Sequence, residues 1–407
     1  MSPTLPLAGV RIIALEQAVA APLCSRHLAD LGAEVIKVER VGGGDFARHY
    51  DSFVDGESSH FVWLNRGKRS IALDVKTPEG RQVLMKLLED ADVLLSNLGP
   101  GAIERIVADD ELVALNPGLI RCVISGYGPD GPYEHRKAFD LLVQGEAGVT
   151  ASTGEAGRPA KSGVSLADLG AGIYSVAAIL AALRGRDASG RGERVEISMF
   201  DVMVEWMSPL LLAYREAGVQ IAPAGTRHAT ITPYGPFVTR DGKTLNIAVQ
   251  NDRQWVALCT LLELTELAAR PELSANSGRL LRRELVERGV QDAVSQREHL
   301  RLAQQLEEAG IPWGALNSIA DVAHHPQLDG AHRWEPVALP SGKTVPVVGS
   351  PFRTDGVADA AIKNVPGLGE NTLEILSSLG YTVAQTSQLL REGIAEEAHA
   401  FAGGGLR

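Results

Sequence analysis

Short apolar segments alternate with helical segments along the first half of the chain, and this alternation constrains the fold more than any other feature. The segments predicted to be strands are 10–15, 35–38, 70–73, 93–95, 119–125 and 194–198. Helices are predicted between them, and the helix 77–90 opens on Thr77-Pro78-Glu79, a combination that favours a helix start. Strands that alternate with helices form parallel sheets. We therefore expect an α/β fold with a large Rossmann-like parallel-sheet domain.

The pattern changes after residue 225. Between residues 226 and 249, apolar residues lie among turn residues around Asp241-Gly242, which predicts antiparallel strands. Segment 263–310 is charged and has a helical spacing of apolar residues. These segments predict a second, smaller α+β domain.

The overall charge disfavours a nucleic-acid partner. Lys and Arg total 39 against 50 Asp and Glu, a net charge of −11, which offers no general attraction for a polyanion. No basic-then-apolar leader opens the sequence, and the apolar run 203–212 is interrupted by Glu205 and Pro209 and is too short to cross a bilayer. We expect a cytoplasmic protein without a membrane partner.

The cysteines indicate neither a disulfide framework nor a zinc site. They are three in number, widely separated, and without CxxC or Cys/His spacing: Cys24, Cys122 and Cys259. We expect no bound metal.

A dinucleotide cofactor is the first interpretation that a βαβ start invites. Glu39 ends the second predicted strand, where an acid can bind a ribose hydroxyl. The loop after the first strand, however, has no glycine to let a pyrophosphate approach, since it reads Glu16-Gln17-Ala18-Val19-Ala20-Ala21-Pro22. This loop disfavours an NAD enzyme.

Cationic residues recur where we expect strands to end. They are Arg40, Lys68 with Arg69, Arg105, and Arg136 with Lys137. A single cation of this kind is usually solvated surface charge. Because ligands of open α/β sheets collect at one sheet edge, their recurrence favours a polyphosphate ligand.

Asp168 is the one acid inside an apolar run of small residues that continues at helical spacing to residue 183. One interpretation is a helix N-cap, because Asp is a preferred cap. The other is a carboxylate nucleophile, kept ionised by the positive end of the helix and reachable through the space that Gly170 and Gly172 leave open. The two interpretations are compatible.

Four motifs occur in order and resemble the class III CoA-transferases, the CaiB/BaiF family. They are Gly32-Ala-Glu-Val-Ile-Lys-Val-Glu39-Arg40, Asn65-Arg-Gly-Lys68-Arg69-Ser-Ile-Ala-Leu-Asp74, Asn97-Leu-Gly-Pro-Gly101 and Ser125-Gly-Tyr-Gly-Pro-Asp-Gly-Pro132. The resemblance continues through Ala167-Asp168, Glu196-Ile-Ser-Met-Phe-Asp201, Gly225-Thr-Arg-His228 and Pro366-Gly-Leu-Gly369. It covers nearly the whole chain.

The resemblance implies an activity and its residues. Asp168 would attack an acyl-CoA thioester and pass through an anhydride and an aspartyl-CoA thioester. Coenzyme A would be a substrate, with no permanently bound cofactor. The residues at matching CoA-binding positions are Ala18, Arg40, Lys68, Asn97, Leu98, Arg105 and Lys137.

The resemblance also implies an interlocked homodimer whose large domain uses both chain ends. The implied ranges are 1–200 for the first part of the large domain, 201–225 for a linker helix, 226–325 for the small domain, 326–350 for a return linker and 351–407 for the rest of the large domain. The site would lie between subunits, with weaker substrate-binding candidates in Arg227, His228 and Gln250.

A small dicarboxylate such as succinate, mesaconate, malate or citramalate is the expected acceptor. The glycine run of formyl-CoA transferases is replaced here by residues 248–252, which disfavours formate and oxalate. Racemases of the same fold use a histidine where this chain has Phe139, and phenylalanine cannot carry a proton. The alternatives are racemase-like proton transfer and a catalytically silent CoA-binding protein.

Overall fold

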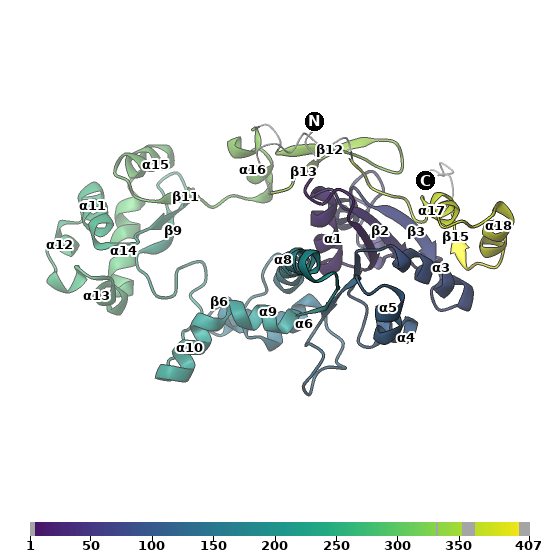
Figure 1. Ribbon diagram of the computed structural model, residues 1–407. Helices are drawn as coiled ribbons and strands as arrows, with labels where there is room; N and C mark the ends of the chain where they lie inside the picture. Colours follow the sequence, from purple (N-terminus) through teal and green to yellow (C-terminus); the bar gives the residue numbers. More distant parts are fainter. Residues whose placement is uncertain (1–4, 331–332, 352–362, 399–407) are drawn as a thin grey trace. The chain divides into compact units, whose positions relative to one another are not determined.

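The computed structural model describes residues 5–330, 333–351 and 363–398. It divides into two compact units (Figure 1). Unit 1 comprises Met1–Ala147, Gly163–Ser208 and Gly330–Arg407, and unit 2 comprises Gly148–Ser162 and Pro209–Asp329. These boundaries differ from the expected ranges, because unit 2 takes in 148–162 and also 209–225 of the expected linker helix.

Unit 1 is built on a mostly parallel sheet, so the α/β fold with a large parallel-sheet domain is confirmed. Among the described residues this sheet has seven strands in the order β15-β3-β2-β1-β4-β5-β8, and β15 is antiparallel to its neighbour β3. The strands are β1 Arg11–Leu15, β2 Glu34–Glu39, β3 Arg69–Leu73, β4 Val93–Ser96, β5 Ile120–Ser125, β8 Arg194–Ser198 and β15 Ala395–Glu396. The strand order reverses between β1 and β4, where open α/β sheets bind their ligands.

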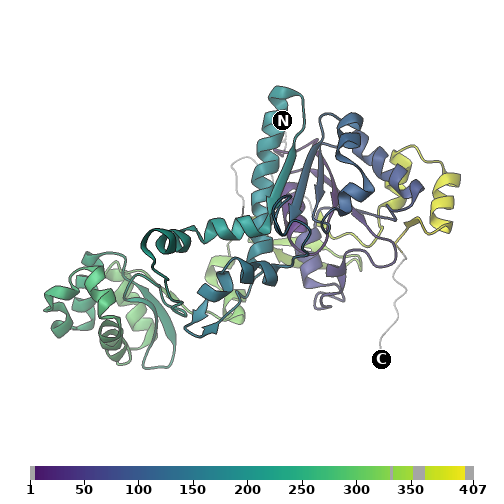
Figure 2. The ribbon, with the colours of Figure 1, turned by 90° about the horizontal axis from the view of Figure 1, so that it is seen from below.

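Helices cover both faces of this sheet (Figure 2). One face carries α1 Ala20–Asp30, α2 Ser59–Asn65, α8 Leu166–Ser189 and α9 Met199–Trp206. The other carries α3 Pro78–Glu89, α4 Ala102–Ile106, α5 Asp109–Leu115, α17 Thr372–Ser378 and α18 Val383–Arg391. Apolar side chains of this second group, such as Leu84, Ile103 and Ile375, pack against the inward residues of β1 to β4.

Helix α8 is the central helix of unit 1. It is long and apolar enough by composition to cross a membrane, but half of its most apolar window is buried inside the protein. A side chain at Gly170 would meet Val202 at 2.7 Å, and one at Gly172 would meet the carbonyl oxygen of Ala20 at 2.7 Å. The expectation that these glycines leave open space is therefore wrong, because α9 and α1 fill it.

The segment expected to be a return linker forms a second small sheet of unit 1. Its strands are β12 Trp334–Ala338, β13 Thr344–Val348 and β14 Lys363–Asn364. Val337 and Leu339 are buried there against Phe61 of α2. These contacts tie the segment into the unit.

Unit 2 has its own core around an antiparallel sheet in the order β11-β10-β9. The strands are β9 Tyr234–Val238, β10 Thr244–Ala248 and β11 Trp313–Ala315. The helices are α11 Asp252–Leu262, α12 Thr265–Ala268, α13 Asn276–Leu281, α14 Arg283–Val294, α15 His299–Glu308 and α16 Ile319–Ala323. Earlier segments of the unit form α7 Val149–Ser152, β6 Gly154–Glu155, β7 Arg158–Pro159 and α10 Ser208–Ala217.

Candidate active site

Two cavities lie at the carboxyl edge of the parallel sheet, beside the point where the strand order reverses. The first, the Asp168 cavity, has a volume of about 480 Å³. The second, the basic cavity, has a volume of about 870 Å³. They share Gln17, Leu98 and Gly99, which follow β1 and β4. One elongated ligand could therefore occupy both.

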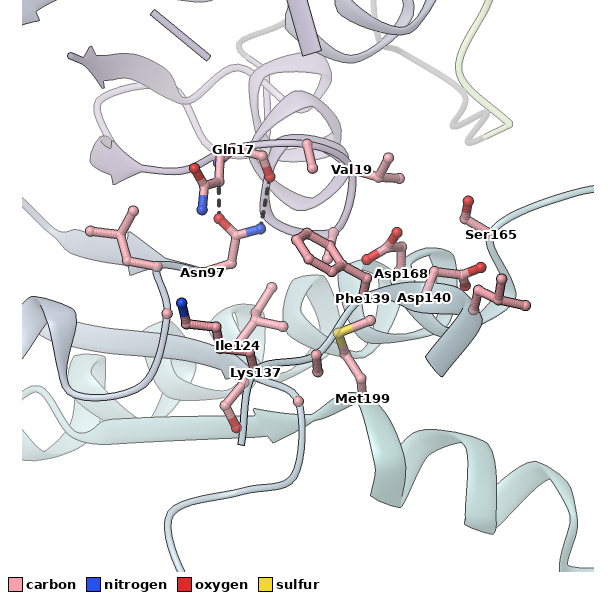
Figure 3. Close-up of a pocket in the computed structure, with 18 of the residues that line it drawn as sticks. Gln17, Val19, Asn97, Ile124, Lys137, Phe139, Asp140, Ser165, Asp168 and Met199 are labelled. Atoms are coloured by element: carbon pink, nitrogen blue, oxygen red, sulfur yellow. Dashed lines mark hydrogen bonds between the residues drawn. The ribbon is translucent and has the colours of Figure 1, made fainter. Parts of the chain in front are cut away.

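Asp168 lines the first cavity from the first turn of α8 (Figure 3). It is the third residue of the helix, which begins at Leu166 with Ser165 as its N-cap. The interpretation of Asp168 as the N-cap is therefore wrong. Its carboxylate is partly exposed, near the positive end of the helix, which stabilises a negative charge there.

A second acid, Asp140 of α6 Asp140–Glu146, provides the capping that one of the two interpretations gave to Asp168. Its Oδ1 accepts a hydrogen bond from the backbone N–H of Ala167 at 2.9 Å. Its Oδ2 accepts one from Gln144 at 2.7 Å, and both side chains are buried. Asp140 also lines the Asp168 cavity. Sequence analysis missed this role, because a cap supplied by another helix leaves no local pattern.

The loop after β1 forms one wall of the cavity, and Asn97 holds it. The backbone N–H of Gln17 donates to Asn97 Oδ1 at 2.9 Å, and Asn97 Nδ2 donates to the carbonyl of Gln17 at 2.8 Å. Figure 3 shows this pair beside Lys137. Ala18, Asn97, Leu98 and Lys137, all expected to bind CoA, line this cavity.

Aromatic side chains that sequence analysis did not single out form another wall. Phe46, Tyr50 and His60 line the cavity, as does Phe139, which is 64% exposed. Partial burial and the negative charges of Asp45 and Asp168 raise the pKa of Tyr50. An aromatic wall suits the body of an acyl group better than it suits water.

The basic cavity gathers cations from three strand ends. Arg40 follows β2, Lys76 follows β3 and Arg105 lies in α4, and all three are exposed and line the cavity. None of the three has a carboxylate within ion-pair distance among the described residues. Arg40 Nε donates to the carbonyl of Gly44 at 2.8 Å. Such cations are suited to bind phosphate groups.

Lys68 lies apart from both cavities. It was expected to follow a strand end, and this is wrong because β3 begins one residue later, at Arg69. Its ammonium group is buried and donates to Glu16 Oε1 at 2.6 Å and to Asn65 Oδ1 at 3.0 Å. Burial lowers the pKa of Lys68 to about 8, against the opposing charge of Glu16. The cation at the carboxyl end of β3 is Lys76, which we had not predicted.

The carboxylate of Glu39 is also hydrogen-bonded to other residues of the protein. It is buried, and its two oxygens accept hydrogen bonds from Arg48 at 2.6 and 2.8 Å and from Ser70 at 2.7 Å. Although Glu39 lines the basic cavity, both of its oxygens are therefore already hydrogen-bonded within the protein.

The weaker substrate candidates all belong to unit 2. Arg227 pairs with Glu287 at 3.3 Å, His228 stacks on Tyr234 with ring centroids 5.1 Å apart, and Gln250 is exposed. The residues that line the Asp168 cavity all belong to unit 1. Within the described part of the chain, no group of three or more His, Cys, Asp or Glu residues is placed to hold a metal ion.

A parallel sheet with a carboxylate cavity and a basic cavity at its switch point is the architecture of an α/β enzyme for an anionic ligand. Comparison with known proteins identifies the family of this enzyme. Residues 7–372 match the family described as CoA-transferase family III, to which this chain belongs.

Two relatives and one solved structure illustrate the similarity. The chain is 34% identical to a succinate–glutarate CoA-transferase of Agrobacterium fabrum, over 92% of this chain and 96% of the relative. It is 33% identical to a succinyl-CoA:mesaconate CoA-transferase of Haloarcula hispanica, with the same coverage. The crystal structure of a CaiB/BaiF family protein from Brucella suis is similar with a TM-score of 0.78 and 34% identity, over 92% of this chain and 99% of that one.

Proposed function

We propose that this protein transfers CoA from an acyl-CoA thioester to a small dicarboxylic acid, with Asp168 as the nucleophile. The observation that carries the proposal is the placement of Asp168 in a cavity that shares a wall with a basic cavity. The names of the relatives from Agrobacterium fabrum and Haloarcula hispanica support dicarboxylates such as succinate and mesaconate.

Each chemical step exchanges one acyl bond for another. A carboxylate oxygen of Asp168 attacks the thioester carbonyl, the C–S bond breaks, and CoA leaves as a thiolate while a mixed anhydride forms. The thiolate then attacks the aspartyl carbonyl, which releases the donor acid and leaves an aspartyl-CoA thioester. The acceptor carboxylate reverses these two steps and regenerates Asp168, with no net proton transfer. Covalent catalysis divides a difficult exchange into easier ones.

The CoA molecule would extend across both cavities. Arg40 and Arg105 would contact its phosphates in the basic cavity, whereas Ala18, Leu98 and Lys137 would contact the part near the thioester. Lys76 takes the place that we had expected for Lys68, because its side chain lines the cavity and that of Lys68 is buried.

We further propose that the protein is an interlocked cytoplasmic homodimer, as its family resemblance implies. Unit 2 of a partner subunit would then supply Arg227, His228 and Gln250 to the acceptor. Racemase chemistry is not proposed, because this chain has Phe139, which lines the cavity, at the position of the histidine in the racemases that it resembles.

Intact-protein mass spectrometry tests the proposal. Succinyl-CoA is incubated with the protein, hydroxylamine is added to trap the acylated aspartate, and peptide mapping locates the adduct. We expect the adduct on Asp168, and CoA transfer to a panel of dicarboxylates.

Asp201→Asn is the matched control for Asp168→Asn. Asp201 is also the third residue of its helix, α9, but it does not line the Asp168 cavity. Asp168→Asn should abolish both adduct and transfer, whereas Asp201→Asn should retain them. Full transfer by the Asp168 variant would overturn the mechanism.

A further inference from the structure

Ala18, in the wall of the Asp168 cavity, has a backbone conformation that its side chain disfavours. Its φ is +61°, in the left-handed region that residues with a Cβ atom seldom adopt. Such a conformation persists only where neighbouring groups impose it, and it tends to occur at functional sites. The question is which group imposes it here.

The backbone of Ala18 is hydrogen-bonded to the carboxylate of Asp45, a residue that is 3% exposed. The backbone N–H of Ala18 donates to Asp45 Oδ1 at 3.0 Å. The preceding residue, Gln17, is already held by Asn97 through both of its backbone groups. Asn97 therefore holds this loop at Gln17, and Asp45 holds it at Ala18.

The same oxygen also holds the start of the aromatic wall. Asp45 Oδ1 accepts the backbone N–H of Ala47 at 2.9 Å and so caps the 3₁₀ turn η1 Phe46–His49. Phe46 in this turn and Tyr50 directly after it line the Asp168 cavity. One carboxylate oxygen therefore joins the loop after β1 to the aromatic wall.

The other oxygen is held by a buried cation. Lys37 Nζ, fully buried in β2, donates to Asp45 Oδ2 at 2.9 Å. An ionised aspartate can accept on both oxygens, whereas asparagine has one oxygen and an NH₂ group. Asparagine would either direct that NH₂ group at the Lys37 ammonium or lose the backbone N–H groups.

We propose that Asp45 is a positioning residue for the transfer reaction: it holds Ala18 in the left-handed conformation and fixes the two cavity walls that flank Asp168. The inference rests on the proposed function, because the effect is expected on the transfer rate. Asp45 does not line the Asp168 cavity, although it lines the neighbouring basic cavity.

The first test combines Asp45→Asn with Ala18→Gly. We expect Asp45→Asn to lower kcat/KM about tenfold, the factor for roughly one lost hydrogen bond. Glycine adopts positive φ without strain, so Ala18→Gly should recover about threefold or more in the Asp45→Asn background. The effect of Ala18→Gly in the otherwise unchanged protein is measured as the reference, and the rescue is the gain in the Asp45→Asn background relative to it. A purely structural role for Asp45 would give no such selective rescue.

Asp92→Asn is the matched control. Asp92 accepts one backbone N–H, from Arg11 at 2.7 Å, where Asp45 accepts two, and like Asp45 it binds one cation, here Arg186 at 2.8 Å, but it precedes β4 at the opposite edge of the sheet. Ala18→Gly should give no rescue in the Asp92→Asn background. Equal effects of Ala18→Gly in all backgrounds, or a fully active Asp45→Asn variant, would overturn the proposal.

A second pair of variants leaves Asp45 in place, in case its replacement prevents folding. Ala18→Asn and Ala18→Val add side chains of similar size, but asparagine tolerates positive φ and a β-branched residue does not. We expect the transfer activity of the Asn variant to be about fivefold or more that of the Val variant. Equal losses would show that size, and not backbone conformation, matters at this position. If the unchanged protein transfers no CoA at all, the proposed function fails instead.

Discussion

The buried pair between Glu39 and Arg48 predicts a stability change that can be worked out from the structure. Burial by itself would raise the pKa of Glu39, but hydrogen bonds from Arg48, with the charge of Lys37 and a bond from Ser70, lower it from 4.5 to about 2. That fall corresponds to about 3 kcal/mol of stability at pH 7. We therefore expect Glu39→Gln to destabilise unit 1 by about 3 kcal/mol, which is also typical of a broken buried ion pair.

The sign of the pH dependence follows from the lowered pKa. The contribution of Glu39 is fully present above its unfolded pKa of 4.5 and is lost as the pH falls towards its folded pKa of about 2. The difference between the unchanged protein and Glu39→Gln should therefore be constant from about pH 7 to pH 5 and shrink between about pH 4.5 and pH 2.

Urea denaturation measures this difference, with hydrogen exchange of peptides covering β2 and β3 used to follow unit 1 alone. The control is Glu374→Gln, because Glu374 pairs with Arg69 at 3.0 Å but is 69% exposed. An exposed pair of this kind is worth at most about 1 kcal/mol. The reasoning is refuted if Glu39→Gln costs no more than the control at pH 7, or if its cost is the same at pH 7 and near pH 2.

Three further predictions concern other parts of unit 1 and the thiols. Lys76→Gln should raise the KM for acyl-CoA about tenfold or more without changing the melting temperature, whereas Lys68→Met should lower stability by about 3 kcal/mol, and steady-state kinetics with thermal melts would distinguish them. Asp140→Ala should cost about 1 kcal/mol through loss of the cap on α8, most of which Asp140→Asn should restore; equal costs in urea unfolding would contradict the capping role. Burial raises the pKa of Cys122 to about 12 and that of Cys259 to about 11, so both thiols should resist iodoacetamide at pH 8 until the protein is unfolded; rapid labelling of the native protein, seen by mass spectrometry, would argue otherwise.

The parallel strands were predictable because each carries a local signal. The predicted strand 194–198 coincides with β8, and the strand predicted at 10–15 differs from β1 by one residue. The short strand β15 was not predicted, because two residues carry no periodicity and its partner β3 lies more than 300 positions away. The strands β12 and β13 lie in the segment that the family resemblance implied to be a return linker, although its short apolar segments between proline and glycine turns predicted strands.

Only some residues of the site could be predicted from the sequence. Asp168 stood out as an acid within an apolar run, but its spacing also fitted a helix N-cap, and only the family resemblance favoured the nucleophile. The sequence could not show whether Lys68 or Lys76 lies at the ligand-binding edge of the sheet. Both lysines flank β3, and only the residue at which the strand begins decides between them. Asp45 and Asp140 were missed because they act on backbone groups of distant segments, and no spacing in the sequence records such contacts.

The pairing of β15 with β3 bears on how the molecule is made. Asn371 Oδ1 accepts the N–H of Ser70 at 3.0 Å, and Thr372 Oγ1 accepts that of Ala72 at 3.2 Å, so the edge of the sheet at β3 is covered by residues that are synthesised long after it. The middle of the chain, with its own core, can assemble earlier during synthesis. A nascent chain stalled before residue 370 would therefore present an unprotected strand to its neighbours, a known route to aggregation.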